Sequence, residues 1–177
     1  RMVRGFVLNN QLTDFSSSPL DQNGQPMANR LAPGKRPRSS MAPTLVFDKR
    51  ADASRGALLM GTGSPGGAAI IQYVTKTLVG VLDWGLNAQQ ATAMVDFGAA
   101  NSATTYVGGE HPNVAPEHGG HNDALVQGLK ALGHTVNVGA QSSGTGTIVR
   151  SAQGWTGGAD PRREGLVLGD TSAPRLP

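Results

Sequence analysis

A glycine-rich turn is the part of the sequence best suited to chemistry. Residues 61–67 read GTGSPGG and join an apolar run of strand length to the start of a predicted helix. Successive glycines let backbone N–H groups approach a ligand closely, and a helix N-terminus adds positive potential. The turn therefore suits an anion, either a phosphate or the oxyanion of an acyl transfer. A tight turn without a ligand is the simpler structural interpretation.

The same turn has a second functional interpretation. Gly61, Gly63 and Gly66 match the G-x-G-x-x-G pattern of nicotinamide dinucleotide-binding domains. Asp83 has about the offset of the ribose-binding acid, but it falls in a predicted helix rather than at a strand end. A P-loop is excluded, because Gly67 stands where that motif requires Lys.

Two further groups of polar residues could hold a zwitterionic ligand. Ser39 and Ser40 lie in a stretch bracketed by prolines and beside several arginines, where two hydroxyls can donate to a carboxylate. Gln11 and Asp14 follow the first apolar segment, and an amide and a carboxylate at this spacing can hold an ammonium group. Ordinary turn residues are the structural alternative for both groups.

Composition and spacing argue against several other functions. The 177 residues include no Cys, which excludes thiolate metal sites and cysteine catalysis. The acidic and histidine residues of 110–121 match no common metal spacing, so we expect no metal and no cofactor. The net charge of +3 comes without an aromatic stacking platform, and no apolar stretch reaches the ~18 residues of a membrane span. We therefore expect neither nucleic acid nor membrane as a partner.

The elements that must position these groups follow from periodicity. We expect a buried strand over 2–10, a long loop over 16–35, and strands over 44–48 and 57–60 joined as a hairpin. A helix over 68–84, with an apolar face of Ile71, Val74, Leu78 and Val81, precedes a second helix capped by Asn87 and Gln90.

The second half of the chain completes this prediction. After a Gly/Pro-rich loop over 106–120, a third helix over 123–132 ends at Gly133, and strands over 135–138, 145–149 and 153–156 close an antiparallel meander. Strands, then helices, then strands predict an α+β fold rather than a regular βαβ alternation. We expect one domain over 1–170 and a loose tail over 171–177.

Four segments together resemble the small subunit of the γ-glutamyltransferases, also called glutathione hydrolases. They occur in family order: residues 5–16 (GFVLNNQLTDFS), 34–44 (GKRPRSSMAPT), 63–67 (GSPGG) with the following helix, and 158–165 (GADPRREG). The resemblance implies the N-terminal-nucleophile (Ntn) hydrolase superfamily, with a four-layer αββα sandwich. It also implies a precursor, or zymogen, that matures by autocatalytic cleavage.

In that family the new N-terminal Thr attacks a γ-glutamyl amide, and the acyl-enzyme passes to water, an amino acid or a peptide. Residue by residue, the resemblance implies that Gln11 and Asp14 bind the glutamyl ammonium and that Ser39 and Ser40 bind its carboxylate. It assigns Gly66 and Gly67 to the oxyanion hole. Many members have Glu where this chain has Gln11, which keeps hydrogen bonding but carries less charge.

The family's Thr-Thr start would precede Arg1, and we expect missing upstream sequence because the chain opens within a predicted strand. The implied partner is the large subunit of the same precursor, and the chain alone is predicted to be inactive. A related acylase of cephalosporin or glutaryl amides stays an alternative, as does the dinucleotide-binding domain. The family implies a periplasmic or secreted location, with a cytoplasmic one left open.

Overall fold

A computed structural model describes residues 2–50, 52, 54–99, 102–108 and 123–169. The chain divides into two compact units, Arg1–Ser40 and Met41–Pro177, and each is described by itself. The elements are mixed strands and helices, which confirms the α+β prediction. The expected tail over 171–177 lies outside the described residues.

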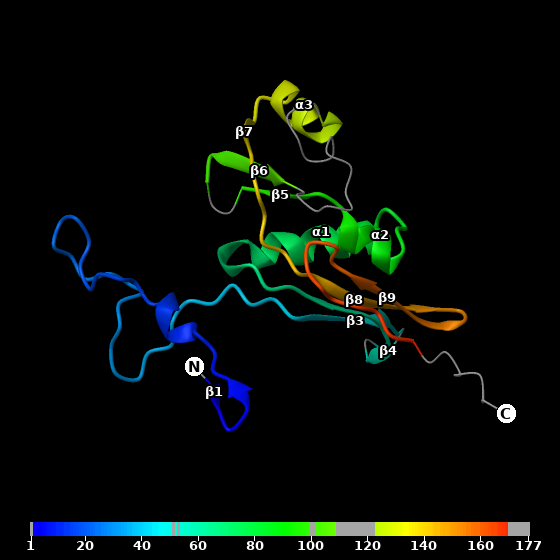
Figure 1. Cartoon of the computed structure of the whole chain (residues 1–177), viewed down its shortest axis with the longest axis horizontal. Coiled ribbons are helices and arrows are strands. Elements are labelled where there is room, and N and C mark those ends of the chain that lie inside the picture. The colour runs from blue at the N-terminus through cyan, green and yellow to red at the C-terminus, as the bar shows by residue number, and fades with distance from the viewer. Residues whose placement is uncertain (1, 51, 53, 100–101, 109–122, 170–177) are drawn as a thin grey trace. The chain divides into compact units, whose positions relative to one another are not determined.

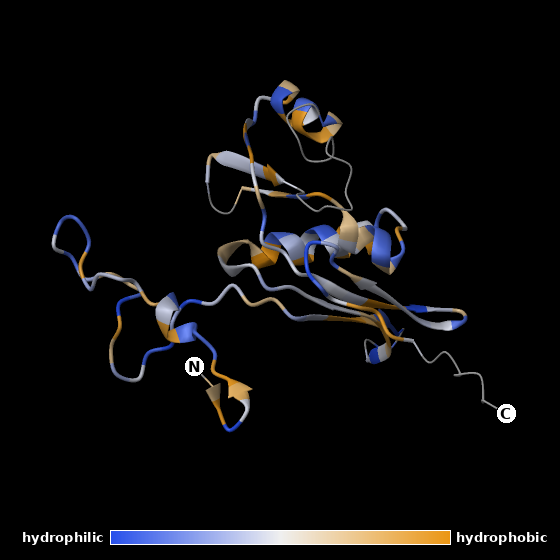
Figure 2. Ribbon diagram, in the orientation of Figure 1, coloured by the Kyte–Doolittle hydropathy of each residue, from blue (hydrophilic) through white to orange (hydrophobic). Residues whose placement is uncertain are grey.

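The first unit opens with a hairpin, not with the single buried strand predicted over 2–10. Strand β1 (Met2–Val3) pairs antiparallel with β2 (Phe6–Val7). Arg4 and Gly5 both have positive φ, at 51° and 86°, which is the backbone of a two-residue primed turn. The prediction was wrong because the apolar run hides this turn. Both strands are exposed, and Figure 2 shows their hydrophobic colouring.

The rest of the first unit has little regular structure. A short 3-10 helix, η1 (Gln11–Asp14), follows the hairpin. The predicted long loop over 16–35 is confirmed, with one isolated bridge between Leu20 and Pro26 among its described residues. Asp21 stabilises a turn within it, because its carboxylate accepts hydrogen bonds from the Asn23 and Gln25 N–H groups at 2.8 Å each.

The second unit is built on a four-stranded antiparallel sheet. Its order is β3-β4-β8-β9, with bounds Thr44–Lys49, Arg55–Gly63, Gly146–Ser151 and Gly154–Ala159. The two predicted hairpins, β3 with β4 and β8 with β9, are confirmed. Because β4 pairs antiparallel with both neighbours, the glycine turn at its end does not belong to the parallel βαβ unit of a dinucleotide-binding domain.

Two helices cover one face of this sheet (Figure 1). Helix α1 (Ile70–Leu82) follows a 3-10 turn, η2 (Gly67–Ala69), and α2 (Ala88–Ala93) follows α1. The predicted capping box is confirmed by hydrogen bonds of 2.8 Å and 3.0 Å between Asn87 and Gln90. The predicted apolar face of α1 is confirmed at Val74, which is buried, and Leu78 and Val81 are half-buried. It was wrong at Ile71, which is exposed, whereas Ile70 and Tyr73 are buried.

A smaller sheet packs against the other side of α1. Its order is β5-β6-β7, with bounds Asp96–Gly98, Thr104–Gly108 and Thr135–Val138, and α1 contacts both β4 and β5. The predicted closing meander was wrong here, because β7 pairs parallel with β6 in this second sheet. Helix α3 (Ala124–Ala131) connects the two strands, and the left-handed Gly133 (φ 88°) follows it as predicted.

The opposite face of the four-stranded sheet is apolar and open. Leu45 and Ile148 flank Gly61 on this face, because both are its cross-strand partners, and they are 62% and 47% exposed. The chain after β9 crosses the same surface, where Val167 packs over Gly157. These residues line a hollow of about 770 Å³. The four-stranded sheet is thus covered by helices on one face, and its other face exposes apolar side chains of the kind that pack against a further layer.

Candidate active site

The glycine turn lies between β4 and α1, as predicted. Gly66 has φ 134° and Gly67 has φ 56°, and both values favour glycine. The Gly66 carbonyl accepts a hydrogen bond from the Ala69 N–H at 3.2 Å, which starts the helical turn. Within the described residues, neither the Gly66 nor the Gly67 N–H donates a hydrogen bond. Two N–H groups are therefore available for an acceptor at this end of α1.

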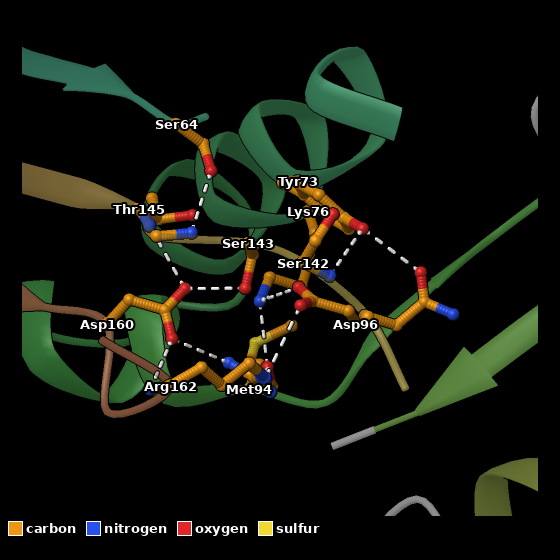
Figure 3. Close-up of polar contacts among 12 residues, drawn as sticks. Ser64, Tyr73, Lys76, Met94, Asp96, Ser142, Ser143, Thr145, Asp160 and Arg162 are labelled. Atoms are coloured by element: carbon orange, nitrogen blue, oxygen red, sulfur yellow. Dashed lines mark hydrogen bonds and ion pairs between the residues drawn. The ribbon is translucent and has the colours of Figure 1, made fainter. Parts of the chain in front are cut away.

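A neighbouring segment, residues 141–145, supports the turn (Figure 3). The Ser64 hydroxyl accepts a hydrogen bond from the Gly144 N–H at 3.1 Å. Pro65 lies so close to Gly144 that an added Cβ there would be 2.7 Å from the Pro65 Cγ. The two backbone segments therefore cross with no room for a side chain at position 144.

A buried ion network holds the other end of this segment (Figure 3). The Asp160 carboxylate accepts hydrogen bonds from the Ser143 hydroxyl at 2.6 Å and the Thr145 N–H at 3.0 Å, and it pairs with Arg162 at 3.0 Å. Arg162 also lies 3.4 Å from Asp96, which pairs with Lys76 at 2.8 Å. The network thus joins the 158–165 motif to α1 and β5.

The charges in this network are set by their surroundings. Burial lowers the pKa of Lys76, and the attraction of Asp96 opposes that shift. Burial alone would raise the pKa of Asp160, but hydrogen bonds from Ser143, Arg162 and Thr145, together with the Arg162 charge, bring it below its usual value. Asp160 is therefore a structural anion rather than a proton donor near neutral pH.

We expect Asp160→Asn to destabilise the protein by about 3 kcal/mol, because the buried Arg162 loses its 3.0 Å ion pair and keeps only the 3.4 Å contact with Asp96. A depressed folded-state pKa contributes stability that is present above the unfolded value of 3.8 and is lost as the pH falls through the lower folded value. Chemical unfolding at pH 7 and below pH 4 measures the effect. The free energies of unfolding of the variant and the wild type should differ at pH 7 and become similar in acid. Asp52→Asn is the control, since Asp52 is fully exposed, and an equal loss there would contradict the explanation.

The predicted ammonium and carboxylate ligands lie in the first unit. Gln11 and Asp14 open and close η1, and Ser39 and Ser40 follow Arg38 at the end of the unit. Asn29 connects the two places. Its side-chain amide donates to the Asp14 carbonyl at 2.7 Å, and its side-chain oxygen accepts from the Arg38 N–H at 3.0 Å. The structure thus joins the Asp14 turn to the segment that leads into Ser39.

Asp14, Asn29 and Arg38 line one hollow of about 680 Å³ in this unit. Sequence reasoning missed Asn29, because nothing in the periodicity or motifs of the loop over 16–35 distinguishes it from the other amide side chains there. Gly66 and Gly67 belong to the second unit, so each group of predicted ligands is described within its own unit. Contact among all of them stays a prediction.

The prediction that the chain has no metal site is based mainly on the histidine-rich segment. His111, His118 and His121 lie outside the described residues. In the part of the chain that is described, no group of three or more His, Asp or Glu side chains could hold a metal ion. No described helix is long and apolar enough to cross a membrane.

Comparison with known proteins agrees with this architecture. A stretch of 92 residues is 42% identical to the glutathione hydrolase proenzyme of Escherichia coli K12 and covers 50% of this chain but 15% of that protein. The γ-glutamyltranspeptidase of Pseudomonas nitroreducens, solved with L-DON, superposes with a TM-score of 0.67 at 27% identity over 93% of this chain and 82% of the solved chain. The cephalosporin acylase of Bacillus halodurans gives a TM-score of 0.64 at 25% identity, over 93% and 27% of the two chains.

An α+β unit whose solved neighbours include γ-glutamyltranspeptidases defines an Ntn hydrolase. The Gamma-glutamyltranspeptidase family profile matches residues 1–169, so the chain belongs to that family. Members of the family are enzymes in which one precursor yields a large and a small subunit. This chain covers only a minor part of the curated proenzymes that it matches.

Proposed function

We propose that this chain is the C-terminal portion of the small subunit of an enzyme that transfers or hydrolyses γ-glutamyl groups. The nucleophile would be a Thr outside this chain, and water, an amino acid or a peptide would accept the acyl group. The observation that carries the proposal is the pair of N–H groups at Gly66 and Gly67, which donate no hydrogen bond within the described residues. Donors of this kind suit the oxyanion of a tetrahedral intermediate.

The donor substrate would be held by its α-amino-acid end. Asp14 would supply the counter-charge for the ammonium, and Gln11 would add a hydrogen bond. Ser39 and Ser40 would donate to the carboxylate. The hydrogen bonds that Asn29 makes to Asp14 and Arg38 support this assignment, because they hold the two ligand groups on one framework.

The remaining partner would be the rest of the precursor. The face around Leu45, Gly61 and Ile148 is apolar and largely exposed, and the β1–β2 hairpin exposes Phe6 and Val7 at 75% and 78%. Surfaces of this kind fit an upstream strand layer or the large subunit rather than water. The family supports a periplasmic or secreted location for the assembled enzyme.

An acylase of glutaryl or cephalosporin amides is the second candidate, and the similarity to the Bacillus halodurans acylase favours it. The two functions differ at one chemical group. A γ-glutamyl amide carries an α-ammonium, and a glutaryl amide has only hydrogens there. The exposed Asp14 carboxylate in η1 has a role with the first substrate and none with the second.

We expect the 177-residue chain to be inactive by itself, and the complete reading frame to release p-nitroaniline from γ-glutamyl-p-nitroanilide. The measurement is parallel turnover of the isolated chain, the complete protein, and the complete protein with glutaryl-p-nitroanilide. Turnover by the isolated chain would contradict the proposal that the nucleophile lies outside it. A preference for the glutaryl anilide would favour the acylase.

A further inference from the structure

We infer that Tyr73 is a positioning residue for the Gly66–Gly67 oxyanion turn, an inference that rests on the proposed function. Tyr73 lies in α1, seven residues after Gly66, and it is only 2% exposed. The Tyr73 hydroxyl forms no hydrogen bond with the described members of the ion network, and an apolar ring would suffice for packing against the sheet. The reason for burying a tyrosine here lies at the turn.

The ring of Tyr73 packs directly against the turn. A Cβ built on Gly66 would lie 2.4 Å from the Tyr73 Cε2 and 3.5 Å from the Ser142 carbonyl oxygen. Gly66 is therefore confined between an aromatic ring and the supporting segment, residues 141–145. Gly66 has a φ of 134°, which residues other than glycine rarely adopt. The contact with the ring therefore fixes the peptide whose N–H would face the oxyanion.

The hydroxyl of Tyr73 fastens the segment to α1 (Figure 3). It accepts a hydrogen bond from the Ser142 N–H at 3.2 Å and donates to the Gln141 side-chain oxygen at 3.1 Å. Both bonds span nearly 70 residues of sequence. A buried hydroxyl that uses donor and acceptor together holds its partners in one arrangement.

Arg163 binds the carbonyl oxygens of the same segment. Its Nε and Nη2 atoms donate to the Ser143 and Ser142 carbonyls, each at 3.0 Å. Ser142 is thus held through its N–H by Tyr73 and through its carbonyl by Arg163. The chain of contacts runs from these two side chains through 142–144 to Ser64, Pro65 and Gly66.

This arrangement predicts a selective effect on the transition state. The ligands assigned to the substrate's ammonium and carboxylate lie in the other unit, so a small displacement of the turn should leave ground-state binding intact. Displacement of preorganised donors lowers the rate of the chemical step instead. Tyr73→Phe is the sharpest change, because it keeps the ring against Gly66 and removes only the hydroxyl.

The test uses the complete, processed enzyme with γ-glutamyl-p-nitroanilide. We expect Tyr73→Phe to lower kcat roughly tenfold and to leave KM within about twofold. The inhibition constant of a γ-boronic acid analogue of glutamate, which forms a tetrahedral anion with the nucleophile, should rise by the same factor as kcat falls. The inhibition constant of glutamate itself should not change. Tyr106→Phe is the matched control, since Tyr106 is 40% exposed on β6.

Unchanged kcat in a processed Tyr73→Phe enzyme would overturn the inference, and so would equal weakening of glutamate and boronate binding, which indicates general damage. If this variant does not mature, Arg163→Ala decides, because Arg163 is exposed and its loss should not prevent folding. We expect it to lower kcat about threefold with the same selectivity, and wild-type kcat would overturn the inference. An inactive wild-type enzyme would count against the proposed function instead.

Discussion

Replacing Asp14 by Ala in the complete enzyme should lower kcat/KM for a γ-glutamyl anilide roughly 100-fold. The reason is electrostatic: the substrate's α-ammonium would lose its only assigned counter-charge, and a close charge pair in a binding site is worth several kcal/mol. Gln11, on the same short helix, cannot compensate, because its side chain is neutral. Steady-state kinetics of the processed variant measure the effect.

A glutaryl anilide provides the internal control, since it lacks the α-ammonium and is otherwise the same acyl donor. We expect Asp14→Ala to leave kcat/KM for this substrate within about threefold, so that discrimination between the two substrates collapses. Asp21→Ala is the comparison variant, because that carboxylate lines the same hollow but accepts hydrogen bonds from the N–H groups of its own turn. Equal losses on both anilides would mean that Asp14 supports the structure of the first unit and does not bind the ammonium.

Local signals in the sequence predict the parts of this fold that depend on local interactions. The Asn87 and Gln90 capping box, the left-handed Gly133 and the strand–turn–helix around Gly66 are set by hydrogen bonds and backbone conformations within a few residues. Such features leave a residue pattern that can be read directly. The same reasoning predicts the α+β class, because the order of strands and helices is a local property of each segment.

Tertiary contacts decide the features that sequence reasoning missed. Ile71 and Ile70 are indistinguishable in hydropathy, and only the sheet packed against α1 determines that Ile70 is buried. The pairing of β7 with β6 joins residues that are 31 positions apart in sequence, such as Thr104 and Thr135. Asn29 and Tyr73 belong to no sequence motif, and the proposals for them rest on their hydrogen bonds to Asp14, Arg38 and Ser142. Contacts of this kind have no periodic signature in one sequence.

Gly66→Ala should lower kcat by at least roughly 100-fold, about the cost of losing one oxyanion donor. A methyl group at this position meets the Tyr73 ring at 2.4 Å, and the backbone has φ 134° and ψ 20°, a conformation that L-residues rarely adopt. Tyr73 belongs to α1 and its side chain is buried, so the turn rather than the ring must move. The Gly66 N–H would then no longer face the position proposed for the oxyanion.

Gly63→Ala makes the same chemical change three residues earlier, where the backbone φ is ordinary and the nearest atom to an added Cβ is Pro43 Cα at 4.0 Å. We expect near wild-type kcat from that control, measured on processed enzyme of matched thermal stability. Similar activity in both variants would show that the turn takes no part in the reaction, because a displaced Gly66 would then have no effect on catalysis. A large loss at Gly66 alone, with an unchanged KM, would place the turn at the tetrahedral intermediate, since only a group that binds more tightly in the transition state changes kcat without KM.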